Sequence, residues 1–146
     1  MNMNEEINLS RFTDAQNKVY STALDEIKQG RKRTHWMWYI FPQIQGLGFS
    51  ETSKYYSIRN LQEANQYLKH PMLGNRLILI CQALLDLPGK DANKIFGSPD
   101  DLKLKSSMTL FASLEETNPV FQMVLDKFFN GKRDVRTKEI IAQASM

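Results

Sequence analysis

Polar side chains at helical spacing among apolar ones are the residues of this sequence best suited to chemistry. Gln16, Arg76 and Ser107 each have apolar residues three and four positions away in stretches typical of helices. A polar group buried there without a partner costs roughly 1–3 kcal/mol, and a charged guanidinium costs more. Each must therefore find a partner, reach water or line a cavity. Lys103 precedes Ser107 by four residues, on one helical face, where an amine could activate the hydroxyl as a nucleophile.

A second set of candidates lies in residues 34–45, THWMWYIFPQIQ. His35 stands between a basic run and the aromatic block and could act as an acid or base. Trp38 could stack on the ring of a ligand, and the amide of Gln43 could orient one. Trp36 and Trp38 diverge by about 200° on a helix, so we expect at least one of them in the core of a short buried helix or turn.

Each of these residues also has an ordinary structural role. Gln16 could bond to backbone at a helix crossing, Arg76 could lay its methylenes on apolar surface, and Ser107 could bond to the carbonyl one turn earlier. Lys103 could be a solvated helix residue, and His35 a hydrogen-bonded structural imidazole. The sequence leaves both interpretations open.

Together these side chains fit a pocket for a small anionic or nucleotide-like molecule. Arg76 and Lys103 would bind the anion, the amides and Ser107 would fix its orientation, and an aromatic ring would stack on it. The candidates for ligand binding are Gln16, Trp38, Gln43 and Arg76. If the site is enzymatic, the candidate catalytic residues are His35, Lys103 and Ser107, and the sequence leaves open whether it is.

Two other functions stay open. The aromatic block at residues 35–41 could dock a protein partner, which would need an exposed apolar patch of more than a few hundred Å². The basic run KQGRKR at residues 28–33 could bind nucleic acid. Basic residues at a helix end usually complement the helix dipole, so nucleic acid is not the expected partner.

The common motifs for metal and cofactor sites are missing from the sequence. Histidine occurs only at positions 35 and 70, there is a single cysteine, and no HExxH is present, so no metal site is expected. Neither a GxGxxG after a strand nor a GxxxxGK[ST] stretch occurs, which argues against the usual dinucleotide and triphosphate folds. We expect no cofactor.

The elements that would position these residues have the patterns of helices. Apolar periodicity and cap residues predict helices over 11–29, 61–69, 71–87, 92–96, 120–129 and 135–143, with another from 99 onward. The segment 71–87 is expected at the centre of the core because apolar residues surround it. Strand signals are weak. We predict an all-α fold, a single multihelical domain of about seven to nine helices, several of them short.

Length and composition agree with one domain. The chain has 146 residues, 42% of them hydrophobic and 24% charged, and its formal charge of +3 permits an anionic ligand. Residues 1–10 are expected to form a flexible N-terminus and 11–146 the domain. The lone Cys81, the polar N-terminus and the lack of a long apolar run predict a cytoplasmic protein without membrane contact.

Long stretches of the sequence resemble the DUF1810 family of small bacterial proteins, sometimes labelled calpastatin-like. In order, they are RFTDAQ (11–16), HWMWYIFPQ (35–43), GLGFS with SKYYSI (46–58), EANQYLKHPMLGNRL (63–77), IFGSPDDLKLKSSMTLF (95–111) and FFNGKRDVRT (128–137). The resemblance implies a predominantly helical single domain, and it implies no reaction, substrate or catalytic residue.

The calpastatin-like label would imply inhibition of a calcium-dependent protease, which does not fit this chain. Inhibitors of that kind resemble disordered repeats, whereas this sequence is rich in core-forming residues. The stretches that resemble the family contain most of the candidate polar residues: Gln16, His35, Gln43, Arg76, Lys103 and Ser107. A pure scaffold would not need these side chains in particular, so the resemblance is compatible with a ligand site.

Overall fold

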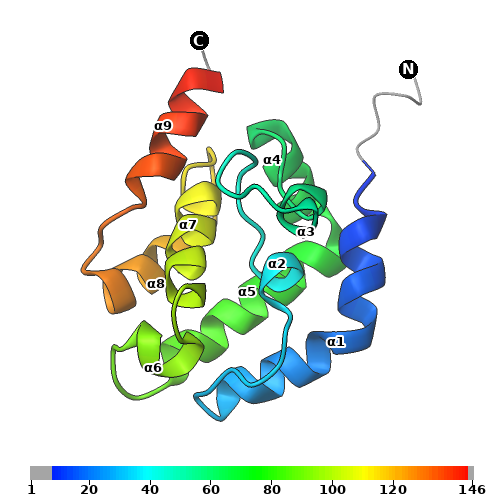
Figure 1. Ribbon diagram of the computed structural model, residues 1–146. Helices are drawn as coiled ribbons and strands as arrows, with labels where there is room; N and C mark the ends of the chain where they lie inside the picture. The colour runs from blue at the N-terminus through cyan, green and yellow to red at the C-terminus, as the bar shows by residue number, and fades with distance from the viewer. Residues whose placement is uncertain (1–7, 145–146) are drawn as a thin grey trace.

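Helices make up most of the structure, as Figure 1 shows. The computed structural model describes residues 8–144, and in that range the chain forms nine helices and one isolated parallel bridge, between Ile44 and Ile58. The helices are α1 (Ser10–Lys28), α2 (Met37–Ile40), α3 (Glu51–Tyr55), α4 (Leu61–Lys69), α5 (Pro71–Asp86), α6 (Ala92–Phe96), α7 (Asp100–Ala112), α8 (Val120–Phe129) and α9 (Val135–Ala144). The predicted all-α fold and the predicted number of helices are confirmed.

Helix α5 lies at the centre of the core, as its apolar sequence predicts. Leu73, Leu77, Ile80 and Leu84 form one of its faces, and each is at most 1% exposed. Helices α1, α4 and α8 pack against α5, which crosses the middle of the molecule in Figure 1. Burial of apolar area on this scale is the main force that holds the helices together.

Polar side chains cap the starts of α4 and α5. The side chains of Asn60 and His70 accept backbone N–H hydrogen bonds at the starts of α4 and α5. Glu63, the third residue of α4, accepts a hydrogen bond from the backbone N of Arg59 at 3.0 Å. Glu63 also pairs with Arg11 Nη2 at 2.8 Å, so its carboxylate ties α4 to α1.

Part of the predicted flexible segment 1–10 lies outside the described residues, namely positions 1–7. Of the remainder, Leu9 is buried at 8% exposure, and Ser10 begins α1. Residues 145–146 of the predicted domain also lie outside the described range.

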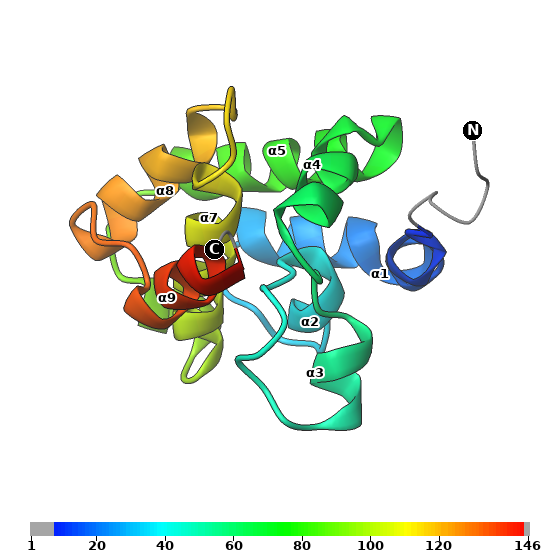
Figure 2. The same ribbon diagram turned by 90° about the horizontal axis from the view of Figure 1, so that it is seen from above.

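The segment between α2 and α3, residues 41–50, runs towards α7 and α9. Hydrogen bonds from Gln45 N to Ile58 O (2.7 Å) and from Ile58 N to Gln43 O (2.8 Å) tie this segment to Ile58, which follows α3. A Cβ added at Gly46 would lie 3.3 Å from Ile140 Cδ1 of α9, so the two parts are close neighbours. Figure 2 shows this segment between α3 and the side of the molecule formed by α7, α8 and α9.

Candidate functional site

A groove opens where three parts of the chain meet. Helix α2 with the segment that follows it, helix α7 and the start of α9 line this hollow, which has a volume of about 320 Å³. We call it the α7 groove. Its lining residues are Trp38, Gln43, Leu47, Gly48, Pro99, Leu102, Lys103, Ser106, Asp134 and Arg136. Small-molecule sites have volumes of roughly 300–1,000 Å³, so the groove lies at the lower end of that range.

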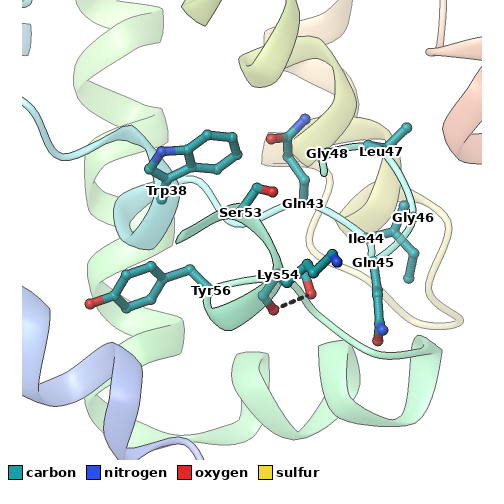
Figure 3. Close-up of a pocket in the computed structure, with 11 residues that line it drawn as sticks. Trp38, Gln43, Ile44, Gln45, Gly46, Leu47, Gly48, Ser53, Lys54 and Tyr56 are labelled. Atoms are coloured by element: carbon teal, nitrogen blue, oxygen red, sulfur yellow. Dashed lines mark hydrogen bonds between the residues drawn. The ribbon is translucent and has the colours of Figure 1, made fainter. Parts of the chain in front are cut away.

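A smaller pocket of about 20 Å³ adjoins the α7 groove. It shares Trp38, Gln43, Leu47 and Gly48 with the groove and adds Ser53 of α3, among others. Figure 3 shows the Trp38 ring, the Ser53 hydroxyl and the Gln43 amide on the same side of this pocket. No hydrogen bond ties the Gln43 amide to another residue in the range 8–144. Gln43 therefore brings a donor and an acceptor to the groove.

Buried Glu26 fixes the connection that places α2. Its carboxylate accepts hydrogen bonds from the backbone N of Arg33 (2.7 Å) and of Thr34 (3.1 Å), from Thr34 Oγ1 (2.7 Å) and from Trp36 Nε1 (2.9 Å). Trp36 is 1% exposed, which confirms that one tryptophan packs in the core. Trp38, two residues later, lines the groove instead.

The same hydrogen bonds determine the charge of Glu26. Burial alone would raise the pKa of this carboxyl, but the donors from Arg33, Thr34 and Trp36 outweigh burial and lower the pKa from 4.5 to about 2. Glu26 is therefore an ionised anchor for the loop between α1 and α2. Because it is 6% exposed and fully engaged, it is not a candidate acid for the groove.

Two lysines and one carboxylate form a cluster beside the α7 groove, and Lys103 is the member of the cluster that lines it. Lys103 Nζ lies 3.1 Å from Asp100 Oδ1, and Lys32 Nζ lies 3.0 Å from Asp100 Oδ2. Each ammonium also sits on an indole ring, Lys103 at 4.0 Å from the centroid of Trp38 and Lys32 at 5.1 Å from that of Trp36. Burial would raise the pKa of Asp100, but the two lysines outweigh it and lower that pKa.

Lys103 has hydrogen-bonding capacity left for a ligand. An ammonium group has three N–H donors, and Asp100 accepts one of them. Contact with the Trp38 ring uses a second direction, which leaves a donor for the groove. Lys32 differs, because its side chain is only 8% exposed and does not line the groove.

A chain of hydroxyl groups runs from the groove to the start of α9. Ser106 Oγ lies 2.9 Å from Thr137 Oγ1, and Thr137 Oγ1 donates to Asp134 Oδ2 at 2.6 Å. Ser106 and Asp134 both line the groove. Ser106 is not among the candidates predicted from the sequence, because apolar neighbours at helical spacing single out Ser107 instead. The spacing of Asp134 and Thr137, a helix cap and its third helical residue, is the signal that could have pointed here.

The candidate residues do not all converge on one cavity. Of the seven candidates, Trp38, Gln43 and Lys103 line the α7 groove. The other four candidates do not line the groove: Gln16, Arg76, His35 and Ser107.

Gln16 and Arg76 pair with each other on the side where α1 packs against α5. Arg76 Nη1 donates to Gln16 Oε1 at 3.4 Å and its Nη2 donates to Asn17 Oδ1 at 3.2 Å. Gln16 Nε2 donates to Tyr39 O at 2.6 Å and to Tyr67 Oη at 2.8 Å. All of these partners are neighbouring protein groups, and the bond from Gln16 to Tyr39 O is the backbone contact that the sequence offered as the structural role of Gln16.

Neither His35 nor Ser107 lines the groove, and the two side chains differ in their exposure to solvent. His35 is exposed, and its backbone carbonyl accepts from Tyr39 Oη at 2.9 Å. Ser107 is fully buried, and its Oγ has no hydrogen-bond partner among residues 8–144. A nucleophile needs access to a substrate, so burial counts against Ser107 in that role. Lys103 points to Asp100 and Trp38 instead of Ser107.

Two features are lacking in the part of the chain that the structure describes. No group of three or more His, Cys, Asp or Glu side chains between residues 8 and 144 could hold a metal ion. Nor does any helix in that range have both the length and the apolar character needed to cross a bilayer.

Comparison with known proteins identifies relatives without an assigned activity. The sequence profile of a family described as "Protein of unknown function (DUF1810)" matches residues 6–141. The crystal structure of the conserved hypothetical protein Rv1873 from Mycobacterium tuberculosis is similar over 92% of this chain and 96% of that chain, with 46% sequence identity and a TM-score of 0.90. No match was found among curated proteins.

Proposed function

The chain belongs to the DUF1810 family, whose description names no reaction, and we propose that its α7 groove binds a small anionic or nucleotide-like molecule. The observation that carries this proposal is the position of Lys103. Its ammonium lies at the wall of the groove, 4.0 Å from the centroid of the Trp38 ring, and keeps a donor for an anion.

Two further polar groups of the groove support the same ligand. Arg136, whose Nη1 lies 3.7 Å from Glu139 Oε1, adds a second positive charge, and Gln43 adds an amide without a protein partner in the described chain. Cationic side chains with a few directional groups on an apolar wall are the usual arrangement of anion sites. Trp38 offers the apolar contact for a ring or sugar face.

A thermal-shift experiment with a matched pair of lysine variants tests this proposal. Millimolar AMP, ADP-ribose or a sugar phosphate should raise the Tm of the unaltered protein, because a ligand that binds only the folded state stabilises it. Lys103→Met should abolish the rise. Lys105→Met should keep it, because Lys105 lies on the same helix but against Phe129, at 5.9 Å. A panel of anions that leaves the Tm unchanged contradicts the proposal.

Docking of a protein partner is the second candidate function. The aromatic block itself gives it little support, because Trp36, Met37 and Phe41 are buried. Exposed apolar residues occur instead beside the groove, where Phe49 is 89% and Leu102 is 58% exposed. A partner that docks there should be lost with Phe49→Ser, whereas the binding of a small anion should be unchanged by that substitution.

Nucleic-acid binding stays the least expected function. In the basic run, Lys32 is held by Asp100, and Arg33 donates to Gln29 Oε1 at 3.2 Å. If nucleic acid were the partner, its affinity should fall steeply with added salt as phosphate counterions are released. Weak binding without that salt dependence argues against this function.

A further inference from the structure

The hydroxyl of Ser106 has a defined hydrogen-bond direction, and that direction restricts the ligand. Thr137 Oγ1 carries one hydrogen, which it donates to Asp134 Oδ2 at 2.6 Å. An ionised carboxylate can only accept, so this donation cannot be reversed. The 2.9 Å contact between Ser106 Oγ and Thr137 Oγ1 must then use the hydrogen of Ser106.

Ser106 lines the α7 groove and is 3% exposed, so the oxygen that it offers there has lone pairs and no hydrogen. Its hydrogen points towards Thr137, which is not one of the residues that line the groove. A hydroxyl oxygen has two lone pairs and can accept from a neighbouring donor. A ligand group that contacts Ser106 must bring the hydrogen itself.

Helix capping does not account for the position of Ser106. Asp134 Oδ2 also accepts from the backbone N of Thr137 at 2.9 Å, so Asp134 and Thr137 form the N-terminal cap of α9. That cap is complete without Ser106. Ser106 lies three residues after Lys103, which places both on one face of α7 at the groove.

We propose that the ligand of the α7 groove is a hydroxyl-bearing oxyanion of the sugar-phosphate type, free or as part of a nucleotide. Its anionic group contacts Lys103, and one of its hydroxyl groups donates to Ser106 Oγ. The free amide of Gln43, on the part of the groove formed by the α2–α3 segment, serves a further hydroxyl as donor or acceptor. This inference rests on the proposed anion-binding function and defines its ligand class.

Calorimetric titration of the unaltered full chain with a graded series of compounds tests the inference. The series is inorganic phosphate, ribose, 2-deoxyribose 5-phosphate, ribose 5-phosphate and AMP. Ribose 5-phosphate should bind about tenfold more tightly than inorganic phosphate, because each hydroxyl paired with the protein adds a hydrogen bond. AMP binding more tightly than ribose 5-phosphate identifies the nucleotide as the source of the sugar phosphate, and equal affinities identify the free sugar phosphate.

Two substitutions assign the effect to Ser106. Ser106→Ala should reduce the affinity for ribose 5-phosphate about tenfold and leave that for inorganic phosphate unchanged, because only the acceptor is removed. Thr137→Ser keeps the direction of the hydrogen and should bind as the unaltered protein does. The ligand series on the unaltered chain does not depend on either variant folding well.

The possible outcomes distinguish failure of the sugar-phosphate inference from failure of the proposed anion-binding function. If inorganic phosphate and ribose 5-phosphate bind equally well, the inference is overturned while anion binding stands. If Ser106→Ala weakens both compounds alike, the hydroxyl contact is also overturned. If none of the anions binds, the proposed function fails and the inference fails with it.

Discussion

At the scale of single residues, two adjacent buried serines of α7 differ in their hydrogen bonding. Ser106, 3% exposed, lines the groove and bonds to Thr137, whereas Ser107 is fully buried and its Oγ has no partner in the described chain. Consecutive helical positions point about 100° apart, so neighbours in sequence face different surroundings. An unpaired buried hydroxyl is destabilising, and a paired one is slightly stabilising.

Alanine at each of the two serines should therefore change stability in opposite directions. Ser107→Ala removes an unpaired polar group and should leave the free energy of unfolding unchanged or raise it by up to about 1 kcal/mol. Ser106→Ala removes a bonded hydroxyl and should lower it by about 1 kcal/mol. Urea unfolding measures both. A clear loss of stability in Ser107→Ala would mean that the hydroxyl does have a partner.

At the scale of elements, a close approach between helices α4 and α5 depends on one glycine. A Cβ at Gly74 would lie 2.0 Å from the carbonyl oxygen of Leu68, which is far inside van der Waals contact. The neighbouring end of α4 leads through His70 and Pro71 directly into α5. The missing side chain at Gly74 is thus what lets the two consecutive helices pack.

Gly74→Ala should force α4 and α5 apart and destabilise the protein. Overpacking of this kind costs about 1–3 kcal/mol, and backbone atoms cannot move aside as easily as a side chain can. Asn75→Ala is the matched control, because Asn75 is exposed on the same helix and alanine is the better helix former. Thermal unfolding should show a lower Tm for the first variant only. Equal Tm values would show that the helices can relax.

At the scale of the whole molecule, the Glu26 anchor makes stability depend on pH. The folded-state pKa of Glu26 is about 2, below its ordinary value of 4.5. A group with a depressed pKa contributes stability above its unfolded-state pKa and loses it as the pH falls towards the folded-state pKa. At about 1.4 kcal/mol per pKa unit, this difference corresponds to roughly 3 kcal/mol.

The stability of the unaltered chain should therefore decline between pH 4.5 and about 2. Glu26→Gln should be less stable at neutral pH and should show a weaker decline over that interval, because it has no carboxylate to protonate. Asp25→Asn changes an exposed neighbour whose carboxylate accepts from Gln29 at 2.8 Å and from no other residue between 8 and 144, so this variant should keep the pH profile of the unaltered chain. Urea midpoints at several pH values measure the effect, and identical slopes for Glu26→Gln and the unaltered chain would contradict it.

Local patterns in the sequence determined the helices. The caps at Asn60 and His70, the proline that starts α5 and the central place of α5 all follow from residues within a few positions of each other. Such features depend on backbone hydrogen bonds and apolar periodicity, which act over one or two turns. The all-α fold could be predicted for this reason.

Only the tertiary structure decided which polar residues meet. Arg76 donates a hydrogen bond to Gln16, which is 60 residues away in the sequence. Lys103 of α7 contacts the ring of Trp38 in α2. The sequence singled out Ser107, and the structure places its neighbour Ser106 at the groove. These contacts depend on how helices cross and how far each is rotated about its axis, which no local pattern specifies.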